Sequence, residues 1–450
     1  MPCRDNNRLD MRNENRQFCR LSACRWHVVA LLGICLLTVC AFLPTFWNGF
    51  QMEWDDQWMV FNPMTKGHLD WDLLKIIFTT SFNGQWGPLN QLAYTVIFRP
   101  FGYDSLAYHV YSLMLHVCNV CLVWLVLSTI LSDCAGLRDS SARRVSLFAT
   151  VLFAVHPLQV ETVAWISASK ILLSSAFYLG AAYAFVSFLK HRGVWSYVLT
   201  VILFGCSYLS KENVLTFPFL TVILSLMYGI PVRSRAFWRM NLPFFVLALL
   251  FGLHLVFFVS GYSAVVHIET FSIGQRVILC CYTLMQYVIK WAVPVGLSWM
   301  HFFPTLPGSA LPFWMVLCPV ALLMMMMVFW NWIRKPIVFL SLLFFVSHLL
   351  FVLHLLFLPR NAIIAERYMY LPIIGLNVIL AYAVSKCVER RRWRYVGKVL
   401  LVAIVVSCVA LTYSRTGRWY DSKVLRENDN TPSRPTGEPE IQSVNHILYY

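Results

Sequence analysis

Long apolar runs separated by short polar segments make up most of this chain, and the first run covers roughly residues 27–46. A helix that crosses a bilayer needs about 20 mostly apolar residues. On that rule we predict ten further spans, near residues 106–131, 145–156, 171–189, 195–210, 214–230, 242–260, 313–332, 337–357, 368–385 and 398–414. The pattern therefore predicts an all-α polytopic membrane protein with about 11 transmembrane helices.

Residues 276–297 form one more apolar run, but this run contains Gln286 and Lys290. Cytoplasmic loops carry an excess of Lys and Arg, so the distribution of charge can decide whether the run crosses. If it does not cross, the loops on the N-terminal side hold 22 of the 36 Lys and Arg residues and 6 of the 21 Asp and Glu residues. A crossing would remove most of this asymmetry. We therefore expect a cytoplasmic N-terminus and an external C-terminus.

Composition supports the membrane class. Of 450 residues, 59% are hydrophobic and 13% are charged, whereas a soluble domain carries about 25% charged residues. This excludes a cytosolic enzyme, a disordered protein and a secreted disulfide scaffold. The net charge of +15 follows from the basic cytoplasmic loops, so we expect no nucleic-acid partner.

The spans divide the chain into three parts. Residues 1–26 are a basic cytoplasmic N-terminus, and residues 27–414 form the transmembrane domain. This domain has two large external loops, a long first loop at 48–105 and a second at 261–311. Residues 415–450 are expected to be a polar, disordered external tail, because they include TPSRPTGEPE.

Polar residues gather on the predicted external side. Ionisable groups at membrane depth are costly and are therefore candidates for function. The sequence EWDDQW contains the adjacent carboxylates Asp55 and Asp56 just after the first span. A carboxylate there can act as a general base or hold a divalent cation; the alternative is a solvated loop with interfacial tryptophans.

A second group follows in the same loop and in the next helix. Trp86 and Asn90 belong to NGQWGPLNQLAY. His109, Ser112, His116 and Asn119 are then spaced by three, four and three residues, which places them on one helix face. We expect His116 and Asn119, which lie deeper, to form hydrogen bonds between helices. His109 is nearer the external end and is a candidate for the site. Two histidines seven residues apart lie about 10 Å from each other along a helix, which argues against a shared metal.

The remaining candidates lie in three short segments between spans. The segment AVHPLQVETVAWISASK contains His156, Glu161 and Lys170. A carboxylate at this depth needs a partner, and we expect Lys170 or His156 to provide it. The other two segments contribute two pairs of neighbours, Lys211 with Glu212 and Arg367 with Tyr368. Arg367 is suited to binding a phosphate; the alternatives are ion pairs within Lys211–Glu212 and Glu366–Arg367.

The ordered series WGPLNQLAY, YHVYSLMLHVCNVCLVWLV, FAVHPLQVETVAWIS, SKENVLTFP and AERYMYLP resembles the C-superfamily (GT-C) integral-membrane glycosyltransferases. The resemblance extends over roughly residues 28–415 and is strongest to the transmembrane and tetratricopeptide-repeat O-mannosyltransferases and their bacterial relatives. It implies a GT-C-like fold and transfer of mannose or a similar hexose from a polyprenyl-phosphate carrier. The acceptor would be a hydroxyl of protein Ser or Thr or of a cell-envelope glycan.

The resemblance also implies roles for individual residues. Asp55 and Asp56 occupy the position of the family's carboxylate motif in the first external loop, and Glu161 matches an acidic residue of the second. Either aspartate would remove the acceptor proton, and displacement of the lipid phosphate would invert the sugar carbon. No further cofactor is implied, although a divalent cation at the acidic motif fits the chemistry.

Two departures from the family pattern bear on acceptor and location. The tetratricopeptide repeats are missing from this sequence, and Lys170 is followed by Ile171 where relatives have an acidic residue. The missing repeats favour a bacterial inner membrane over the endoplasmic reticulum. A lipid or glycan flippase is the alternative from another functional class, although such transporters usually show internal repeats. A structural membrane subunit without activity is the third.

Overall fold

The computed structural model describes residues 27–81, 85–134, 136–259, 271–305, 308–355 and 362–427. Every secondary-structure element in these ranges is a helix and none is a strand, although His301 and Ile364 form an isolated β-bridge. The expected N-terminal segment 1–26 and residues 428–450 of the expected tail lie outside the described residues, as do parts of both large loops.

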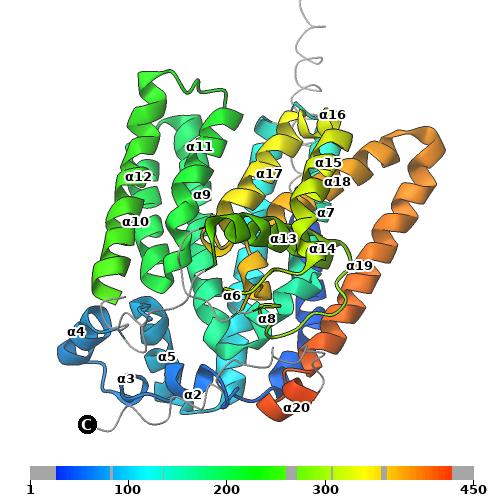
Figure 1. The fold of residues 1–450 in the computed structure, drawn as a ribbon. Helices are drawn as coiled ribbons and strands as arrows, with labels where there is room; N and C mark the ends of the chain where they lie inside the picture. Colours follow the sequence, from blue (N-terminus) through cyan, green and yellow to red (C-terminus); the bar gives the residue numbers. More distant parts are fainter. Residues whose placement is uncertain are drawn as a thin grey trace, which may run out of the picture.

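The long helices run side by side and form a bundle (Figure 1). Each predicted span coincides with one or more helices, some of them short. They are His27–Ala41, α6 (Ser105–Asp133), α7 (Asp139–Val155), α9 (Ser169–His191), α10 (Val194–Ser210), α11 (Phe217–Met227), α12 (Arg235–His254), α14 (Phe313–Val316), α15 (Cys318–Val328), α16 (Trp330–Ile333), α17 (Pro336–Leu349), α18 (Ile373–Glu389) and α19 (Arg394–Gly417). The helices α6 and α9 pack against each other in the centre, with α7, α10 and α18 around them.

Four helices among the described residues are long and apolar enough to cross a membrane, and a fifth arises if α7 and the short α8 (Val160–Ala164) count as one bent span. Exposed apolar side chains cover outward faces of α12, α15 and α19, as expected for contact with lipid. The helix α13 (Ile273–Ala292), which covers most of the ambiguous segment 276–297, is not among these candidates and lies crosswise to the long helices (Figure 1).

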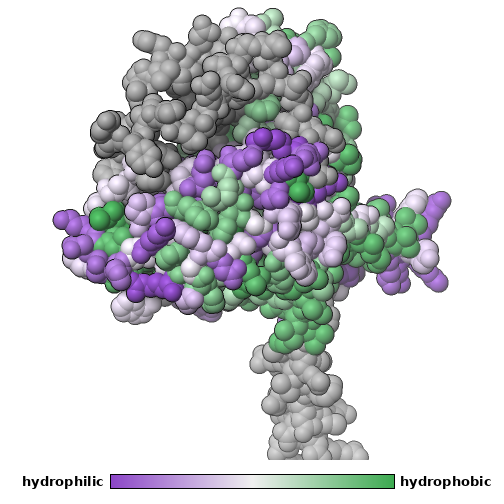
Figure 2. Space-filling view, turned by 90° about the horizontal axis from the view of Figure 1, so that it is seen from below, coloured by the Kyte–Doolittle hydropathy of each residue, from purple (hydrophilic) through white to green (hydrophobic). Residues whose placement is uncertain are grey.

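Short helices cover one end of the bundle, the lower end in Figure 1, which we call the loop end. They include α2 (Asp56–Met59), α3 (Pro63–Lys66), α4 (Trp71–Thr79), α5 (Pro88–Phe101) and α20 (Ser422–Glu427). Two of them are fixed by side-chain caps, because Asn62 accepts the Thr65 N–H and Asp70 accepts the Leu73 N–H. Seen from below, this end carries hydrophilic side chains with hydrophobic ones between them (Figure 2).

The chain also turns sharply at the loop end after α7. His156 is extended because Pro157 follows it, and Pro157 ends the hydrogen-bonding pattern of the helix. The short helices η2 (Pro157–Gln159), α8 and η3 (Ile166–Ala168) then place Glu161 and Ser167 beneath the first loop before α9 begins.

Candidate functional site

The buried carboxylate of Asp56 anchors the segment Glu53–Trp58, which we call the acidic turn. One oxygen accepts the Ser167 N–H at 2.9 Å and the Ser167 hydroxyl, and the other accepts the Gln51 N–H at 2.7 Å. Burial raises the pKa of Asp56 to about 6, although these hydrogen bonds oppose the rise. Asp56 therefore joins the first loop to η3.

Asp55 is in a different environment. Its side chain is half-buried, and within the described part of the chain no side chain or N–H donates a hydrogen bond to its carboxylate. It lies within electrostatic reach of Lys170 and Arg367. The two adjacent carboxylates thus differ, and Asp55 is the more exposed of the two.

Glu161 is fully buried and pairs with Arg367. The Arg367 guanidinium contacts one Glu161 oxygen, and the Arg367 N–H donates to the other at 2.7 Å. The expectation that Lys170 or His156 pairs with Glu161 is wrong, because η8 (Glu366–Met369) brings Arg367 closer. The guanidinium also lies over the rings of Trp165 and Tyr368, with centroid distances of 5.4 and 5.2 Å, and its side chain stays 26% exposed.

Glu366 does not pair with Arg367 either, so that alternative is also wrong. Its carboxylate forms an ion pair with Arg415 at 2.5 Å and accepts the Ser298 N–H at 2.8 Å. The His301 ring lies 3.6 Å away. Arg415 was not predicted as a site residue, because it directly follows the last predicted span and no motif marks it.

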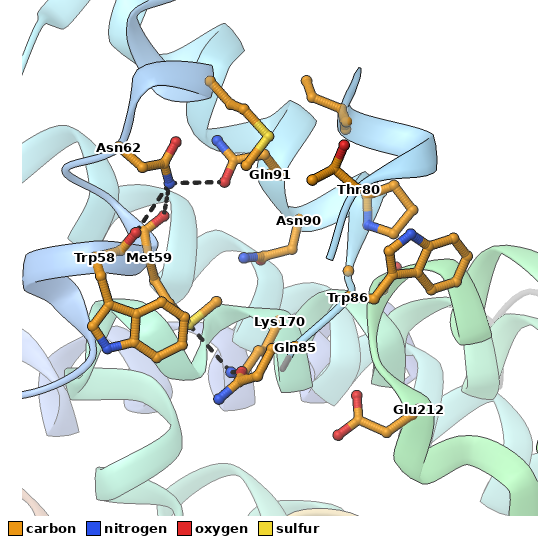
Figure 3. A pocket seen from close by; sticks show the side chains of 15 residues that line it. Trp58, Met59, Asn62, Thr80, Gln85, Trp86, Asn90, Gln91, Lys170 and Glu212 are labelled. Atoms are coloured by element: carbon orange, nitrogen blue, oxygen red, sulfur yellow. Dashed lines mark hydrogen bonds between the residues drawn. The ribbon is translucent and has the colours of Figure 1, made fainter. Parts of the chain in front are cut away.

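A polar pocket lies between the first loop and the start of α9 (Figure 3). Four predicted residues line it: Trp86, Asn90, Lys170 and Glu212. Residues that we had not predicted line it as well, among them Trp58, Gln85 and Gln91. We call this the amide pocket, because Asn90, Gln85 and Gln91 contribute their amides to it.

Several contacts fix the geometry of the amide pocket. Lys170 Nζ donates to Gln85 Oε1 and lies 3.2 Å from Met59 Sδ. Asn90 is 1% exposed, and its Nδ2 has no hydrogen-bond partner in the described ranges. Trp58 and Trp86 lie on opposite sides, with Asn90 between them (Figure 3). A buried donor without a partner and two indole rings are features of a site that binds a polar ligand with apolar faces.

Lys211 and the two candidate histidines do not line this pocket. Lys211 forms an ion pair with Glu212 at 3.5 Å, as one interpretation of the sequence expected. His109 is buried with Nε2 3.4 Å from Gly49 O. His156 contacts Trp291 O through Nε2 at 3.0 Å and accepts the Leu158 N–H at 3.2 Å through Nδ1. These contacts give both histidines a structural role.

The polar stripe on α6 connects helices, as predicted. His116 Nδ1 lies 2.8 Å from the Tyr370 hydroxyl, and Asn119 Nδ2 donates to the same hydroxyl at 3.0 Å. Asn119 also donates to Leu172 O at 2.9 Å. The stripe therefore connects α6 to α9 and to Tyr370, which directly follows η8.

A second pocket lies on the other side of the first turn of α9, and we call it the Arg367 pocket. Arg367, Tyr368, Ser174, Thr216 and His348 are among the residues that line it. The hydroxyl of Tyr178, which also lines it, is hydrogen-bonded to His348 Nε2 at 2.7 Å.

Tyr178 also lines a third cavity, which continues deeper into the bundle between α6, α9, α11, α17 and α18. Apart from Tyr178 and Ser341 its lining is apolar, and we call it the apolar cavity. A polar pocket with a guanidinium thus borders an apolar cavity, with one tyrosine shared by both.

A metal site is not evident in this arrangement. In the described ranges no three His, Cys, Asp or Glu side chains converge as metal ligands would. Both oxygens of Asp56 already accept hydrogen bonds. Only Asp55 remains for the divalent cation considered from the sequence.

Comparison with known proteins gives two relatives. The chain is 33% identical over 134 residues to Protein O-mannosyl-transferase Tmtc1 of Drosophila melanogaster, and 32% identical over 155 residues to Protein O-mannosyl-transferase TMTC3 of Mus musculus. Over these stretches the chain is related to protein O-mannosyl-transferases. The matched stretches cover 30% and 32% of this chain but only 15% and 16% of the two relatives. No protein-family model matches the chain.

Proposed function

We propose that this protein is a glycosyltransferase that moves mannose or a similar hexose from a polyprenyl-phosphate carrier to a hydroxyl acceptor. The acceptor is protein Ser or Thr, or a hydroxyl of a cell-envelope glycan. One observation carries the proposal: Asp55 is an accessible carboxylate within electrostatic reach of Arg367, whose pocket borders an apolar cavity. The partial identity to two protein O-mannosyl-transferases supports the same reaction class.

We assign the donor to the Arg367 pocket and the apolar cavity. The polyprenyl-phosphate carrier has a single phosphate group, which is anionic. A guanidinium can bind this phosphate through two parallel hydrogen bonds. The polyprenyl chain needs an apolar path in the membrane, and the cavity beyond Tyr178 is apolar almost throughout. Lipid, phosphate and sugar would then follow one another from the cavity to the loop end.

We assign the acceptor to the amide pocket. Its amides and Lys170 can bind hydroxyl and carbonyl oxygens, while Trp58 and Trp86 can stack on the apolar face of a sugar or on a side chain. Lys170 lines this pocket and interacts electrostatically with Asp55. The acceptor hydroxyl would thus approach Asp55 from the side opposite to the donor.

In the reaction, the Asp55 carboxylate accepts the proton of the acceptor hydroxyl. The hydroxyl oxygen forms a bond to the anomeric carbon, and the bond from that carbon to the lipid-phosphate oxygen breaks. The electron pair of that bond leaves with the phosphate, and the Arg367 guanidinium stabilises the added negative charge. A single displacement inverts the anomeric carbon.

We further propose the GT-C-like arrangement of 11 spans, with the loop end on the external or lumenal side of the membrane. The short helices α2 and α5 of the loop end include Asp56 and Asn90, whereas the basic segment Arg391–Trp393 lies between α18 and α19 at the other end of the helices. A bacterial inner membrane and the endoplasmic reticulum are the two candidate locations. Both relatives are animal proteins, which favours the second.

A lipid or glycan flippase is the second candidate function, because a polar pocket beside an apolar cavity could also move a lipid-linked sugar. One experiment separates the two. Purified protein in vesicles is given polyprenyl-phosphate sugars with radiolabel in the sugar, together with a Ser/Thr-rich peptide. A transferase moves label to the peptide and releases unlabelled lipid phosphate. A flippase changes the leaflet of an intact labelled lipid, and that result would contradict our proposal.

A further inference from the structure

The end of α19 and the helix α20, residues 412–427, pack directly on the loop that carries the acidic turn. Hydrogen bonds join the two segments, among them Asn48 Nδ2 to Thr416 O at 3.1 Å, Gly49 N–H to Tyr420 O at 2.7 Å and Gln51 Nε2 to Trp419 O at 2.8 Å. A side chain on Gly49 would lie 3.3 Å from Tyr420 O, so the two backbones approach closely. Glu53 and Arg426 add an ion pair at the surface.

Gln51 connects this segment to the buried carboxylate. Its side-chain Nε2 donates to Trp419 O, while its backbone N–H donates to Asp56 Oδ2 at 2.7 Å. Ser422 Oγ donates to Gln51 Oε1 at 3.2 Å. Gln51 is 1% exposed, so these hydrogen bonds are shielded from water. Gln51 therefore links the segment 412–427 directly to Asp56.

The same segment also contacts the other two loops of the site. Thr412 Oγ1 donates to Val155 O at 2.8 Å, and Arg415 Nη1 donates to Pro157 O at 2.9 Å. Arg415 also pairs with Glu366, the residue before Arg367. The segment 412–427 is thus bonded to the loops that carry Asp55, Glu161 and Arg367.

Trp419 fills the space between these loops. It is 1% exposed, and its ring centroid lies 6.2 Å from that of Trp54 and 6.2 Å from that of Trp165. Trp54 precedes Asp55, and Trp165 lies under the Arg367 guanidinium. One buried indole is therefore packed between the neighbours of the proposed base and of the proposed phosphate ligand.

We infer that residues 412–427 position the acidic turn for catalysis, with Gln51 and Trp419 as positioning residues that act through Asp55 and Asp56. The inference rests on the proposed function, because it concerns the distance between the base and the donor site. A displacement of about 1 Å at a reacting group can lower a rate about 100-fold. The end of α19 and the helix α20 are then part of the framework of the active site.

The test compares Gln51→Ala with Gln57→Ala in the full chain. Gln51→Ala removes both side-chain contacts and keeps the backbone N–H that binds Asp56. Gln57 is an exposed glutamine on α2 and serves as the matched control. We expect kcat to fall about ten- to 100-fold in Gln51→Ala, with the KM values for donor and acceptor unchanged, and to stay the same in Gln57→Ala. Ser422→Ala, which removes one of the two contacts, should show a smaller fall.

Hydrogen–deuterium exchange of the same proteins is a readout independent of activity. Amides of residues 49–56 should exchange faster in Gln51→Ala than in the unaltered chain, while those of α6 and α9 should not change. Faster exchange with unchanged kcat would make the contact structural only and overturn the inference, as would unchanged exchange in this loop. If the unaltered chain transfers no sugar, the proposed function fails, and with it the catalytic part of the inference. The exchange result would still test whether residues 412–427 hold the loop.

Discussion

The Arg367 guanidinium and the Glu161 carboxylate form a buried ion pair between positions 206 residues apart in the chain. Glu161 is inaccessible, whereas the Arg367 side chain is 26% exposed and lines a pocket. The carboxylate therefore holds the guanidinium in place and leaves part of it free for an anionic ligand. Under the proposed function, Glu161 is a positioning residue and Arg367 is the phosphate ligand.

Replacing Arg367 by Ala should reduce both stability and turnover. It leaves the buried Glu161 carboxylate unpaired, which typically costs about 3–5 kcal/mol. Thermal unfolding and the KM for the lipid donor measure the two effects. Arg367→Lys should restore part of the stability but little of the donor affinity, because Lys cannot make the bidentate contact.

The double variant Glu161→Gln with Arg367→Ala separates a structural role from a catalytic one. Removing both charges should recover stability, and we expect donor affinity to stay low. Arg99→Ala, an exposed arginine at the end of α5, is the control. Full turnover in the double variant would show that Arg367 only neutralises Glu161.

The raised pKa of Asp56 predicts how stability changes with pH. Burial raises the pKa of the Asp56 carboxyl from its ordinary value of 3.8 to about 6, so the folded state binds the proton more tightly than the unfolded state. Protonation of Asp56 therefore stabilises the folded state, fully below about pH 4, and this contribution to the free energy of unfolding is lost as the pH rises through 6. The melting temperature of the unaltered protein should thus fall, relative to that of Asp56→Asn, as the pH rises from 4.5 to 7. A relative gain over this range would show that the hydrogen bonds outweigh burial.

Substitution of Asn90 tests the assignment of the acceptor to the amide pocket. Its buried Nδ2 has no partner in the described part of the chain, so it is free to bind a ligand oxygen. Asn90→Ala should raise the acceptor KM about tenfold, the effect of losing roughly 1.4 kcal/mol, and leave the donor KM unchanged. Gln57→Ala again provides the control. A change in the donor KM alone would reverse our assignment of the pockets.

Filling the apolar cavity tests the donor path. Val378 lines the cavity on α18 and is buried, so Val378→Phe should occupy space that we assign to the polyprenyl chain. Affinity for a long-chain donor should fall more than affinity for a short-chain one. Val402→Phe on the lipid-facing side of α19 is the matched control. Equal affinities for both donors in Val378→Phe would place the chain elsewhere.

Much of the fold follows from the hydrophobic pattern, because apolar length determines where long helices form in such a chain. Each predicted span coincides with helical structure, and α13 lies crosswise, in the segment that charge asymmetry had set apart. The segment 415–427 differs from expectation. We expected a polar tail there, but α19 continues to Gly417 and α20 packs on the first loop, because Trp419 and the backbone carbonyls around it find buried partners.

The candidate site was partly predictable. The predicted topology placed the candidate residues on one side of the membrane. In the structure Glu161 and Arg367 are paired, and Asn90 and Lys170 line one pocket. Ion-pair partners could not be predicted, since they depend on how loops far apart in sequence meet. Sequence neighbours suggested Glu366 for Arg367, whereas the fold gives Glu161 to Arg367 and Arg415 to Glu366.

The most direct test of the central claim is the release of lipid phosphate by the unaltered protein and by Asp55→Asn. The substitution keeps the size of the side chain and removes the base, which typically costs about 10²–10⁴-fold. Asp72→Asn, an exposed carboxylate on α4, is the control. We predict acceptor-dependent release in the unaltered protein and in Asp72→Asn, and a loss of at least 100-fold in Asp55→Asn at normal expression and melting temperature. Undiminished release by Asp55→Asn would contradict the account.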